Sequence, residues 1–432
     1  MLFLFYRYLC SLFLRKKNLV TYNKLKILND PIYGFISIPN SLLYDLIEHP
    51  YFQRLRRINQ MGLSYLVYPG ATHTRFHHAL GCMHMMQKAV QVLKSKNVEI
   101  SQEEENALYI AILLHDIGHG PFSHAMENSI VENVHHEEIS LFFMNALNDE
   151  FNGQLSLAIE IFKGNYHRKF LLQLISSQMD MDRMDYLKRD SFYSGVAEGN
   201  INSERLVQMI NVHDDYLVVE EKGIYSVEKF LVGRRLMYWQ CYLHKTSVMA
   251  EMILTKILKR AKELTEKGVH LWCSDSLHFF LTNHIEKADF NKEALKKFAL
   301  LDDSDIIGAL KNWQFHEDFI LSSLSNSIIN RKLFHILNVE KNQQDELLDL
   351  YRKQINSELK LDINELDYFV FGGMMKNKAY DKNAEPIRIL TKNKQIIDVL
   401  QASDQSNLAA LSVPVKKYFV CFPKNITLKN IQ

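Results

Sequence analysis

The sequence has almost no net charge. Its 432 residues contain 51 Lys and Arg against 50 Asp and Glu, which leaves a formal charge of +1. A protein without an overall positive field has no general attraction for nucleic acid or for anionic membranes. Recognition of a phosphate-bearing partner would therefore depend on a local basic pocket, and nucleic-acid binding is not indicated.

Cysteines are few and scattered, and no pair has the CxxC spacing. The five are Cys10, Cys82, Cys241, Cys273 and Cys421. This pattern is typical of reduced thiols in a cytoplasmic protein. It predicts neither a disulfide framework nor a zinc site built from cysteines.

Long hydrophobic runs are also scarce. The first 20 residues, MLFLFYRYLCSLFLRKKNLV, are apolar, but Arg7 interrupts them and a basic cluster follows. The run is too short to span a bilayer, and it lacks the positive leading region and small-residue cleavage site of a secretory signal. We expect residues 1–27 to be a misassigned start or a loosely attached amphipathic segment, with membrane contact as a third alternative.

Histidine is abundant in one part of the chain. Of 18 histidines, nine lie between His73 and His136. A single histidine is usually a surface residue or a hydrogen-bonded core residue, but nine in 64 positions are poorly explained in that way. This crowding indicates a functional site in which several imidazoles work together.

The pattern of apolar residues predicts a mainly α protein. Residues 40–375 have helical periodicity, and the run Ala107–Leu114 is apolar on all sides, which predicts a helix buried all round. Strand-like segments are local: a hairpin over 214–227 centred on Lys222 and Gly223, and short runs after residue 384. We expect a catalytic core (28–250), a helical extension (251–383) and a small α/β tail (384–432).

The segment ILLHDIGHG places His115 and Asp116 directly after the buried run, and His119 follows one turn later. Buried ionisable groups need partners, because their desolvation costs several kcal/mol. Candidate partners are His73, His77 and His78 upstream and Asp180, Asp182, Asp185 and Asp190 downstream. The aspartates alone would suit a solvated acidic face, but positions 180, 182 and 185 cannot share one helical face. An inward carboxylate joined to the histidines would suit a first-row metal.

Four blocks, in this order, resemble the deoxynucleoside triphosphate triphosphohydrolases of the HD-domain phosphohydrolases, including the sterile-alpha-motif-and-HD-domain type. They are YFQRLRRINQMG (51–62), YPGATHTRFHHALG (68–81), HDIGHGPFSHAMEN (115–128) and DMDRMDYLKRD (180–190). The resemblance covers residues 28–250 and implies an HD-domain helical bundle. It implies four metal ligands: His78, His115, Asp116 and Asp182.

The resemblance also implies roles for neighbouring residues. The implied catalytic residues are His119, His124, Glu127 and His136, and the implied substrate contacts are Gln60, Arg75, Tyr186 and Asp190. His124 would be the general acid, and Glu127 stands where the family commonly has Asp. For the four substrate contacts, an ordinary structural role is the alternative. Arg54 and Arg56 match positions that touch a regulatory nucleotide in some relatives.

The implied reaction is hydrolysis of deoxynucleoside triphosphates, dGTP among them, to a deoxynucleoside and inorganic triphosphate by a metal-activated water. The resemblance implies a divalent metal (Mn, Fe, Zn, Ni or Mg), Mg accompanying the nucleotide, an activating nucleotide and a homo-oligomer, either a dimer or a tetramer. Two alternatives remain open: an HD hydrolase acting on another nucleotide or a nucleic-acid phosphoester, and a nucleotide-sensing or nucleic-acid-binding scaffold.

Overall fold

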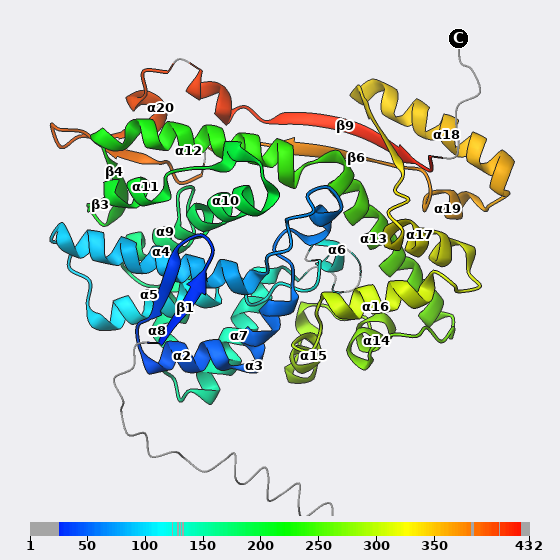
Figure 1. Cartoon of the computed structure of the whole chain (residues 1–432), viewed down its shortest axis with the longest axis horizontal. Helices are drawn as coiled ribbons and strands as arrows, with labels where there is room; N and C mark the ends of the chain where they lie inside the picture. The colour runs from blue at the N-terminus through cyan, green and yellow to red at the C-terminus, as the bar shows by residue number, and fades with distance from the viewer. Residues whose placement is uncertain are drawn as a thin grey trace, which may run out of the picture.

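The computed structural model describes residues 26–122, 124–127, 129, 131, 134–381, 384–405 and 407–424, with the side chains of residues 124 and 127 not described. Residues 1–25 of the predicted N-terminal segment therefore lie outside the described residues, whereas residues 26 and 27 begin strand β1. Figure 1 shows a largely helical molecule with strands near its upper edge, which confirms the mainly α prediction. Within the described residues, no helix is long and apolar enough to cross a membrane.

The helices of the first half are α2 (Ser41–Glu48), α3 (Pro50–Gln53), α4 (Arg75–Ser95), α5 (Gln102–Leu114), α6 (His124–Glu127), α7 (His136–Glu150), α8 (Ser156–Phe162), α9 (Lys169–Ile175), α10 (Met181–Ser194), α11 (Ser203–Met209) and α12 (Ile224–Met237), which a π-helical turn (Tyr238–Tyr242) extends. Those of the second half are α13 (Lys245–Glu266), α14 (Asp275–Thr282), α15 (Lys292–Phe298), α16 (Asp303–Trp313), α17 (Phe319–Ile329), α18 (Gln344–Leu359), α19 (Ile363–Leu366) and α20 (Val399–Ala402).

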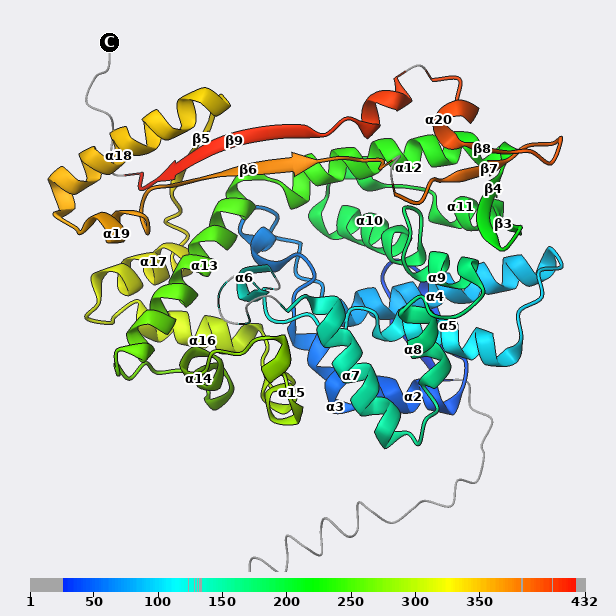
Figure 2. The same ribbon diagram turned by 180° about the vertical axis from the view of Figure 1, so that it is seen from behind.

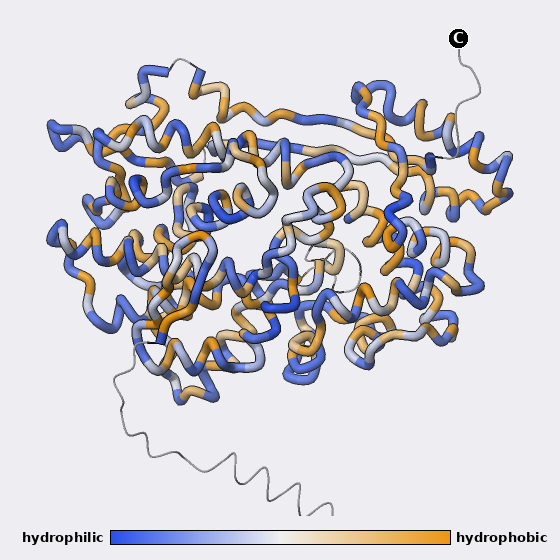
Figure 3. Tube along the Cα trace, in the orientation of Figure 1, coloured by the Kyte–Doolittle hydropathy of each residue, from blue (hydrophilic) through white to orange (hydrophobic). Residues whose placement is uncertain are grey.

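Helix α5 shows how the sequence sets up the site. Ser101 and Glu104 form a capping box, in which the Ser101 hydroxyl accepts from the Glu104 N–H at 3.1 Å and the Glu104 carboxylate accepts from the Ser101 N–H at 2.9 Å. Every residue from Ala107 to Leu114 is buried, as predicted. The tube in Figure 3 instead alternates between polar and apolar residues along most of the outer helices. Because α5 is buried from Ala107 to Leu114, His115, which directly follows this helix, lies in the protein interior.

The strands form three small sheets: β1 (Lys26–Asp30) with β2 (Gly34–Ile38); β3 (Ile210–His213), β4 (Tyr216–Glu220), β7 (Arg388–Leu390) and β8 (Ile396–Asp398); and β5 (His335–Val339), β9 (Val415–Phe422) and β6 (Phe371–Asn377). Figure 2 shows the long strand β9 running along one side of the molecule beside β6.

The hairpin expected over 214–227 is centred elsewhere. Its turn is at Asp214 and Asp215, which have φ values of +49° and +64°, and the strands on either side are β3 and β4. Two consecutive residues with positive φ make the turn that best matches strand twist, and Asp tolerates that conformation. Lys222 and Gly223 instead precede α12. The centre predicted from Lys222-Gly223 was therefore wrong.

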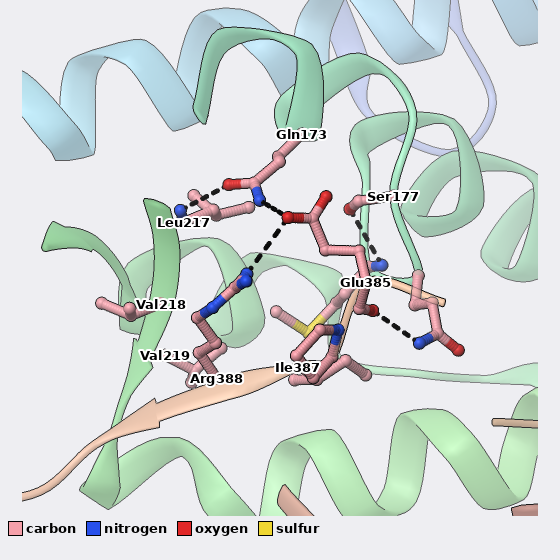
Figure 4. Close-up of a pocket in the computed structure, with 11 residues that line it drawn as sticks. Gln173, Ser177, Leu217, Val218, Val219, Glu385, Ile387 and Arg388 are labelled. Carbon is pink, nitrogen blue, oxygen red and sulfur yellow. Dashed lines mark hydrogen bonds and ion pairs between the residues drawn. The ribbon is translucent and has the colours of Figure 1, made fainter. Parts of the chain in front are cut away.

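The short strands expected after residue 384 are present, but they do not stand apart from the rest of the chain. β7 pairs in parallel with β4, and β9 pairs with both β5 and β6. Figure 4 shows the junction with α9, where Gln173 donates to Glu385 and accepts from the Leu217 N–H at 2.6 Å. Arg388 also contacts Glu385, at 3.2 Å. Residues 384–405 and 407–424 thus complete two sheets and brace the core.

Candidate metal centre and active site

Three helices bring two imidazoles and a carboxylate together. His78 lies in the first turn of α4, His115 directly follows α5, and Asp182 lies in the first turn of α10. The Asp182 carboxylate is 3.1 Å from His78 Nε2 and 3.5 Å from His115 Nε2. Residues far apart in the chain thus meet at one point.

Asp116 is the fourth member of this cluster. Its Oδ2 atom is 3.7 Å from His78 Nε2, and its Oδ1 atom is 3.5 Å from His115 Nε2. Arg75 Nη1 donates to Asp116 Oδ2 at 2.6 Å and so orients the carboxylate. The His78 side chain is fully buried, whereas that of Asp182 is 25% exposed, so the cluster is most open on the Asp182 side.

Both imidazoles are oriented by their Nδ1 atoms. His115 Nδ1 donates to the Ile112 carbonyl at 2.7 Å, and His78 Nδ1 donates to Asp185 Oδ2 at 2.8 Å. These partners fix the tautomer in which Nε2 carries a lone pair, as for metal-bound histidines. His115 Nε2 is buried and has no hydrogen-bond partner. A buried acceptor without a donor is rare and calls for an unseen partner.

The spacing of the donors fits one divalent cation. Two ligand atoms about 2.1 Å from one ion and about 90–110° apart lie about 3.0–3.5 Å from each other. The distances among these nitrogens and oxygens, 3.1–3.7 Å, are close to that range. The residues present therefore suit a metal with imidazole and carboxylate ligands.

Cys82 also lies beside the cluster, one turn after His78 on α4. Its sulfur belongs to the group of potential ligand atoms, with His78, His115 and Asp182, that lie within 4.8 Å of one another. The sulfur is nearly equidistant from the two ring nitrogens of His78, at 3.5 and 3.6 Å, and so packs on the imidazole. Burial raises the pKa of the Cys82 thiol. A thiol that keeps its proton is a poor metal ligand.

Electrostatics in the cluster favour ionised carboxylates. Burial opposes ionisation of Asp116, but His115, His119 and Arg75 hold its pKa well below the ordinary range. Burial likewise opposes ionisation of Asp182, and the adjacent imidazoles of His115 and His78 lower its pKa. Two anionic carboxylates among oriented imidazoles make the point of convergence attractive to a cation.

A second pair of histidines stacks beside the cluster. The rings of His119 and His136 have centroids 3.9 Å apart and planes 16° apart, and His119 Nε2 is 3.4 Å from Asp116 Oδ1. Burial and Arg75 lower the pKa of His119 to about 3, so its imidazole is neutral near pH 7. Helix α6 opens at His124, but the side chains of His124 and Glu127 lie outside the described part of the structure.

The predicted substrate contacts lie on several sides of the cluster. The ring of Tyr186 is 6.4 Å from that of His78 and 5.8 Å from that of Tyr242. Asp190 accepts from Tyr242 Oη at 2.8 Å and pairs with His73 at 2.7 Å, so it holds two neighbouring side chains. Gln60 presents a buried side-chain oxygen that has no hydrogen-bond partner. The ligand roles of these three residues, and that of Arg75, remain predictions.

Two arginines beside Tyr186 were missed by the sequence analysis. Arg183 and Arg234 both act electrostatically on Tyr186. The Nε atom of Arg183, and the Nε and Nη1 atoms of Arg234, are buried without hydrogen-bond partners, although Arg183 also pairs with Asp180. For Arg183, adjacency to Asp182 was an available signal. Arg234 lies in α12, and nothing in its local sequence indicates the site.

Asp185 was considered only as one of several candidate acidic partners. It lies one turn after Asp182 and one turn before Arg189, and it receives His78 Nδ1 and the Arg189 guanidinium. The spacing of 182, 185 and 189 is helical and could have indicated this arrangement. Asp185 therefore supports His78 from behind.

The structure does not support a nucleotide contact for Arg54. Its side chain is fully buried and donates to the carbonyls of Ile117 and His119 at 2.7 and 3.0 Å. Arg54 thus holds the turn that follows His115 and Asp116, and it is not accessible to a surface ligand. Arg56 is exposed and lies over the Phe76 ring, with 3.6 Å between its guanidinium carbon and the ring centroid.

Comparisons with known proteins agree with this geometry. Residues 75–190 match the model of the HD domain, and residues 201–271 match that of the HD associated region. The chain is 34% identical over 394 residues to the uncharacterized protein YwfO of Bacillus subtilis, and the match covers 88% of each protein. A crystal structure of a phosphohydrolase from Bacteroides thetaiotaomicron superposes with a TM-score of 0.88 at 51% identity, covering 92% of this chain and all of that one.

The chain belongs to the HD-domain phosphohydrolase family. Within this family it is also similar to the deoxynucleoside triphosphate triphosphohydrolase SAMHD1 homolog of Dictyostelium discoideum, with 30% identity over 278 residues, 58% of this chain and 54% of that protein. The matched HD-domain segment begins at Arg75 and ends at Asp190. It therefore contains all four residues of the cluster.

Proposed function

We propose that this HD-domain phosphohydrolase hydrolyses deoxynucleoside triphosphates, dGTP among them, to a deoxynucleoside and inorganic triphosphate. The observation that carries the proposal is the convergence of His78, His115, Asp116 and Asp182. One imidazole nitrogen of this cluster, His115 Nε2, is buried without a hydrogen-bond partner. The similarity to relatives named deoxynucleoside triphosphate triphosphohydrolases supports this choice of substrate. We propose that these four residues are the metal ligands.

His78, His115, Asp116 and Asp182 would hold a divalent cation, which would supply Lewis-acid polarisation of a phosphate oxygen and activation of a water molecule. Manganese, iron, zinc and nickel suit the imidazole and carboxylate donors, and magnesium would accompany the nucleotide. Arg75 keeps Asp116 turned toward the imidazoles through their 2.6 Å contact. We assign His124 as the general acid that protonates the leaving 5′-oxygen.

His119 and His136 form the wall beside Asp116. A neutral His119 ring can donate one hydrogen bond to a phosphate oxygen without adding charge, and its stacking on His136 fixes its plane. We assign Glu127 to orient the neighbouring histidines. In this assignment, His119 and His136 accept, donate or stabilise protons. They do so on the side of the metal cluster that is opposite the substrate sugar.

The charged tail of the substrate would lie against Arg183 and Arg234. Their partnerless guanidinium nitrogens offer donors that phosphate oxygens can satisfy. Tyr186 would lie under the deoxyribose, Asp190 would contact a sugar hydroxyl, and Gln60 would face the base or sugar. A ring packed where a 2′-hydroxyl would project rejects ribonucleotides by steric exclusion.

The test is product analysis on a panel of the four dNTPs and four NTPs, with triphosphate resolved from pyrophosphate. We expect triphosphate and deoxynucleoside from dNTPs, dGTP included, and at most trace turnover of NTPs. Release of pyrophosphate or monophosphate would contradict the proposal. The Asp182→Ala variant provides the background rate, since it removes a proposed ligand.

An activating nucleotide and a homo-oligomer, either a dimer or a tetramer, are part of the same proposal. Light scattering of the purified protein with and without dGTP tests both, together with the dependence of the rate on dGTP concentration. A monomer with hyperbolic kinetics at every concentration would contradict them.

A further inference from the structure

A chain of buried charges connects the β1–β2 hairpin to His78. Asp30 ends strand β1, and its Oδ1 atom accepts from the backbone N–H groups of Ile32 and Tyr33 at 2.8 and 3.0 Å. Its Oδ2 atom receives Arg189 Nη1 at 2.8 Å. A single carboxylate thus both shapes the hairpin turn and holds a guanidinium in the core.

Arg189 relays this contact to the proposed metal ligand. Its side chain is fully buried, and its Nε and Nη2 atoms donate to the two oxygens of Asp185, each at 2.9 Å. Asp185 Oδ2 also accepts from His78 Nδ1 at 2.8 Å. The guanidinium therefore uses one edge for Asp185 and its remaining nitrogen for Asp30, and it links the two carboxylates rigidly.

Neighbouring residues leave space for this series of buried charges. A Cβ atom at Gly81 would lie 2.0 Å from Asp185 Oδ1 and 2.3 Å from Arg189 Nη2, so α4 has a glycine where the ion pair passes. The ring of Tyr33, also in the hairpin turn, lies 5.6 Å from the Arg189 guanidinium carbon and covers the pair. The hairpin, α4 and α10 are thus shaped around these charges.

We propose that Asp30 is a positioning residue of the metal centre: by holding Arg189 against Asp185, it fixes the orientation and basicity of the His78 imidazole. The inference rests on the proposed metal site. The second carboxylate offsets the positive charge of Arg189, which leaves Asp185 a stronger acceptor for the His78 Nδ1–H. A stronger acceptor makes Nε2 a better ligand.

The test measures Mn²⁺ affinity of the full chain by electron paramagnetic resonance of free Mn²⁺. Asp30→Asn keeps the size of the side chain but removes the charge that Arg189 needs. We expect Mn²⁺ to bind about 10-fold more weakly, within the range seen when outer partners of metal ligands are changed. Arg189→Lys should give a similar loss, because a compact ammonium cannot hold both oxygens of Asp185 and reach Asp30.

Asp318→Asn is the matched control. Asp318 also caps backbone, accepting from the Leu321 N–H at 2.8 Å, and pairs with a partly buried arginine, Arg260, at 2.6 Å. It lies at α17, far from β1 in Figure 1. We expect this variant to bind Mn²⁺ as the wild type does. Equal affinity in the wild type and all three variants would overturn the inference, whereas failure of the wild type to bind Mn²⁺ would overturn the proposed metal centre itself.

Hydrogen exchange of the wild-type protein tests the coupling without any substitution. If the hairpin supports the ligand, then binding at the ligand must support the hairpin, because coupling free energies are reciprocal. We expect Mn²⁺ to slow amide exchange in residues 26–38 and to leave α17 unchanged. Unchanged exchange in the hairpin upon stoichiometric Mn²⁺ binding would overturn the proposal even if the variants failed to fold.

Discussion

His78 and His115 both direct Nε2 toward Asp182, but different parts of the molecule hold their Nδ1 atoms. His115 donates to the Ile112 carbonyl, three residues earlier in the same chain segment. His78 donates to Asp185, which lies 107 residues later and is itself held by Arg189. One imidazole is oriented by its own helix, and the other depends on tertiary structure. We therefore expect substitutions elsewhere in the molecule to weaken metal binding more readily by disturbing His78 than by disturbing His115.

The largest expected effect comes from removing a ligand. We predict that Asp182→Ala and His115→Ala each reduce turnover to background and lose the metal, while circular dichroism shows the helical fold retained. Both changes remove a donor from the point where the others converge. Cys82→Ala is the control, since its thiol packs on His78 without being a ligand in this account. Retained metal in Asp182→Ala, measured by plasma mass spectrometry, would contradict the ligand assignment.

The next effect separates the two imidazoles. We predict that Asp185→Asn weakens Mn²⁺ binding about 10- to 100-fold, because it leaves the His78 Nδ1–H without an anionic acceptor. Ile112→Ala should lower the melting temperature through lost packing, yet keep Mn²⁺ affinity, because the backbone carbonyl that holds His115 remains. Titration of both variants followed by free Mn²⁺ signal checks this. Equal losses of Mn²⁺ affinity in the two variants would contradict the prediction that the orientation of His78, unlike that of His115, depends on tertiary structure.

A smaller effect is expected where the substrate would bind, because buried guanidinium nitrogens there have no hydrogen-bond partners. We predict that Arg234→Gln raises the KM for a dNTP about 10-fold and leaves Mn²⁺ affinity unchanged, because a charged hydrogen bond contributes about 1.5–3 kcal/mol. Steady-state kinetics with metal in excess measures this. A fall in Mn²⁺ affinity with an unchanged KM would instead place Arg234 in support of the metal ligands.

The smallest effect concerns two buried aspartates. Burial opposes ionisation of Asp185, but Arg189 and His78 lower its pKa to about 2. Burial raises the pKa of Asp303 to about 7, although the backbone N–H groups of Asn59 and Phe122, which donate to its carboxylate, oppose this rise. A raised pKa means that native Asp303 keeps a proton that the unfolded chain releases. Its contribution to stability is thus present at low pH and is lost as the pH rises through 7.

We therefore predict that the melting temperature of Asp303→Asn minus that of the wild type becomes more positive, by a few degrees, between pH 5 and pH 8. The amide cannot ionise, so the variant lacks this loss. Differential scanning fluorimetry at several pH values measures the difference. A constant difference across this range would show that Asp303 is ionised throughout.

The sequence was most informative where structure is local. The all-apolar run of α5 predicted a buried helix, and the capping residues Ser101 and Glu104 mark its start. The resemblance carried by the four blocks predicted that His78, His115, Asp116 and Asp182 meet, and the structure brings these residues together. The hairpin turn at Asp214 was predicted at the wrong position. Lys222-Gly223 gives a stronger local turn signal, and positive φ at two aspartates is rare.

Other tertiary contacts were not indicated by the sequence. Nothing near Asp30 indicates that it meets Arg189, 159 residues later, and nothing near Arg234 indicates its electrostatic interaction with Tyr186. Arg54 has the same kind of local sequence as Arg56, yet one is buried against carbonyls and the other is exposed. Burial of a charged side chain depends on how distant helices pack, and local patterns do not encode it.

We propose above that His78, His115, Asp116 and Asp182 bind one cation. X-ray absorption spectroscopy of the purified, metal-loaded protein, together with metal counting, tests this coordination. We predict one ion per chain, coordinated by nitrogen and oxygen at about 2.0–2.2 Å and by two imidazoles. A sulfur neighbour at about 2.3 Å, which would implicate Cys82, or the absence of a stoichiometric ion would contradict it.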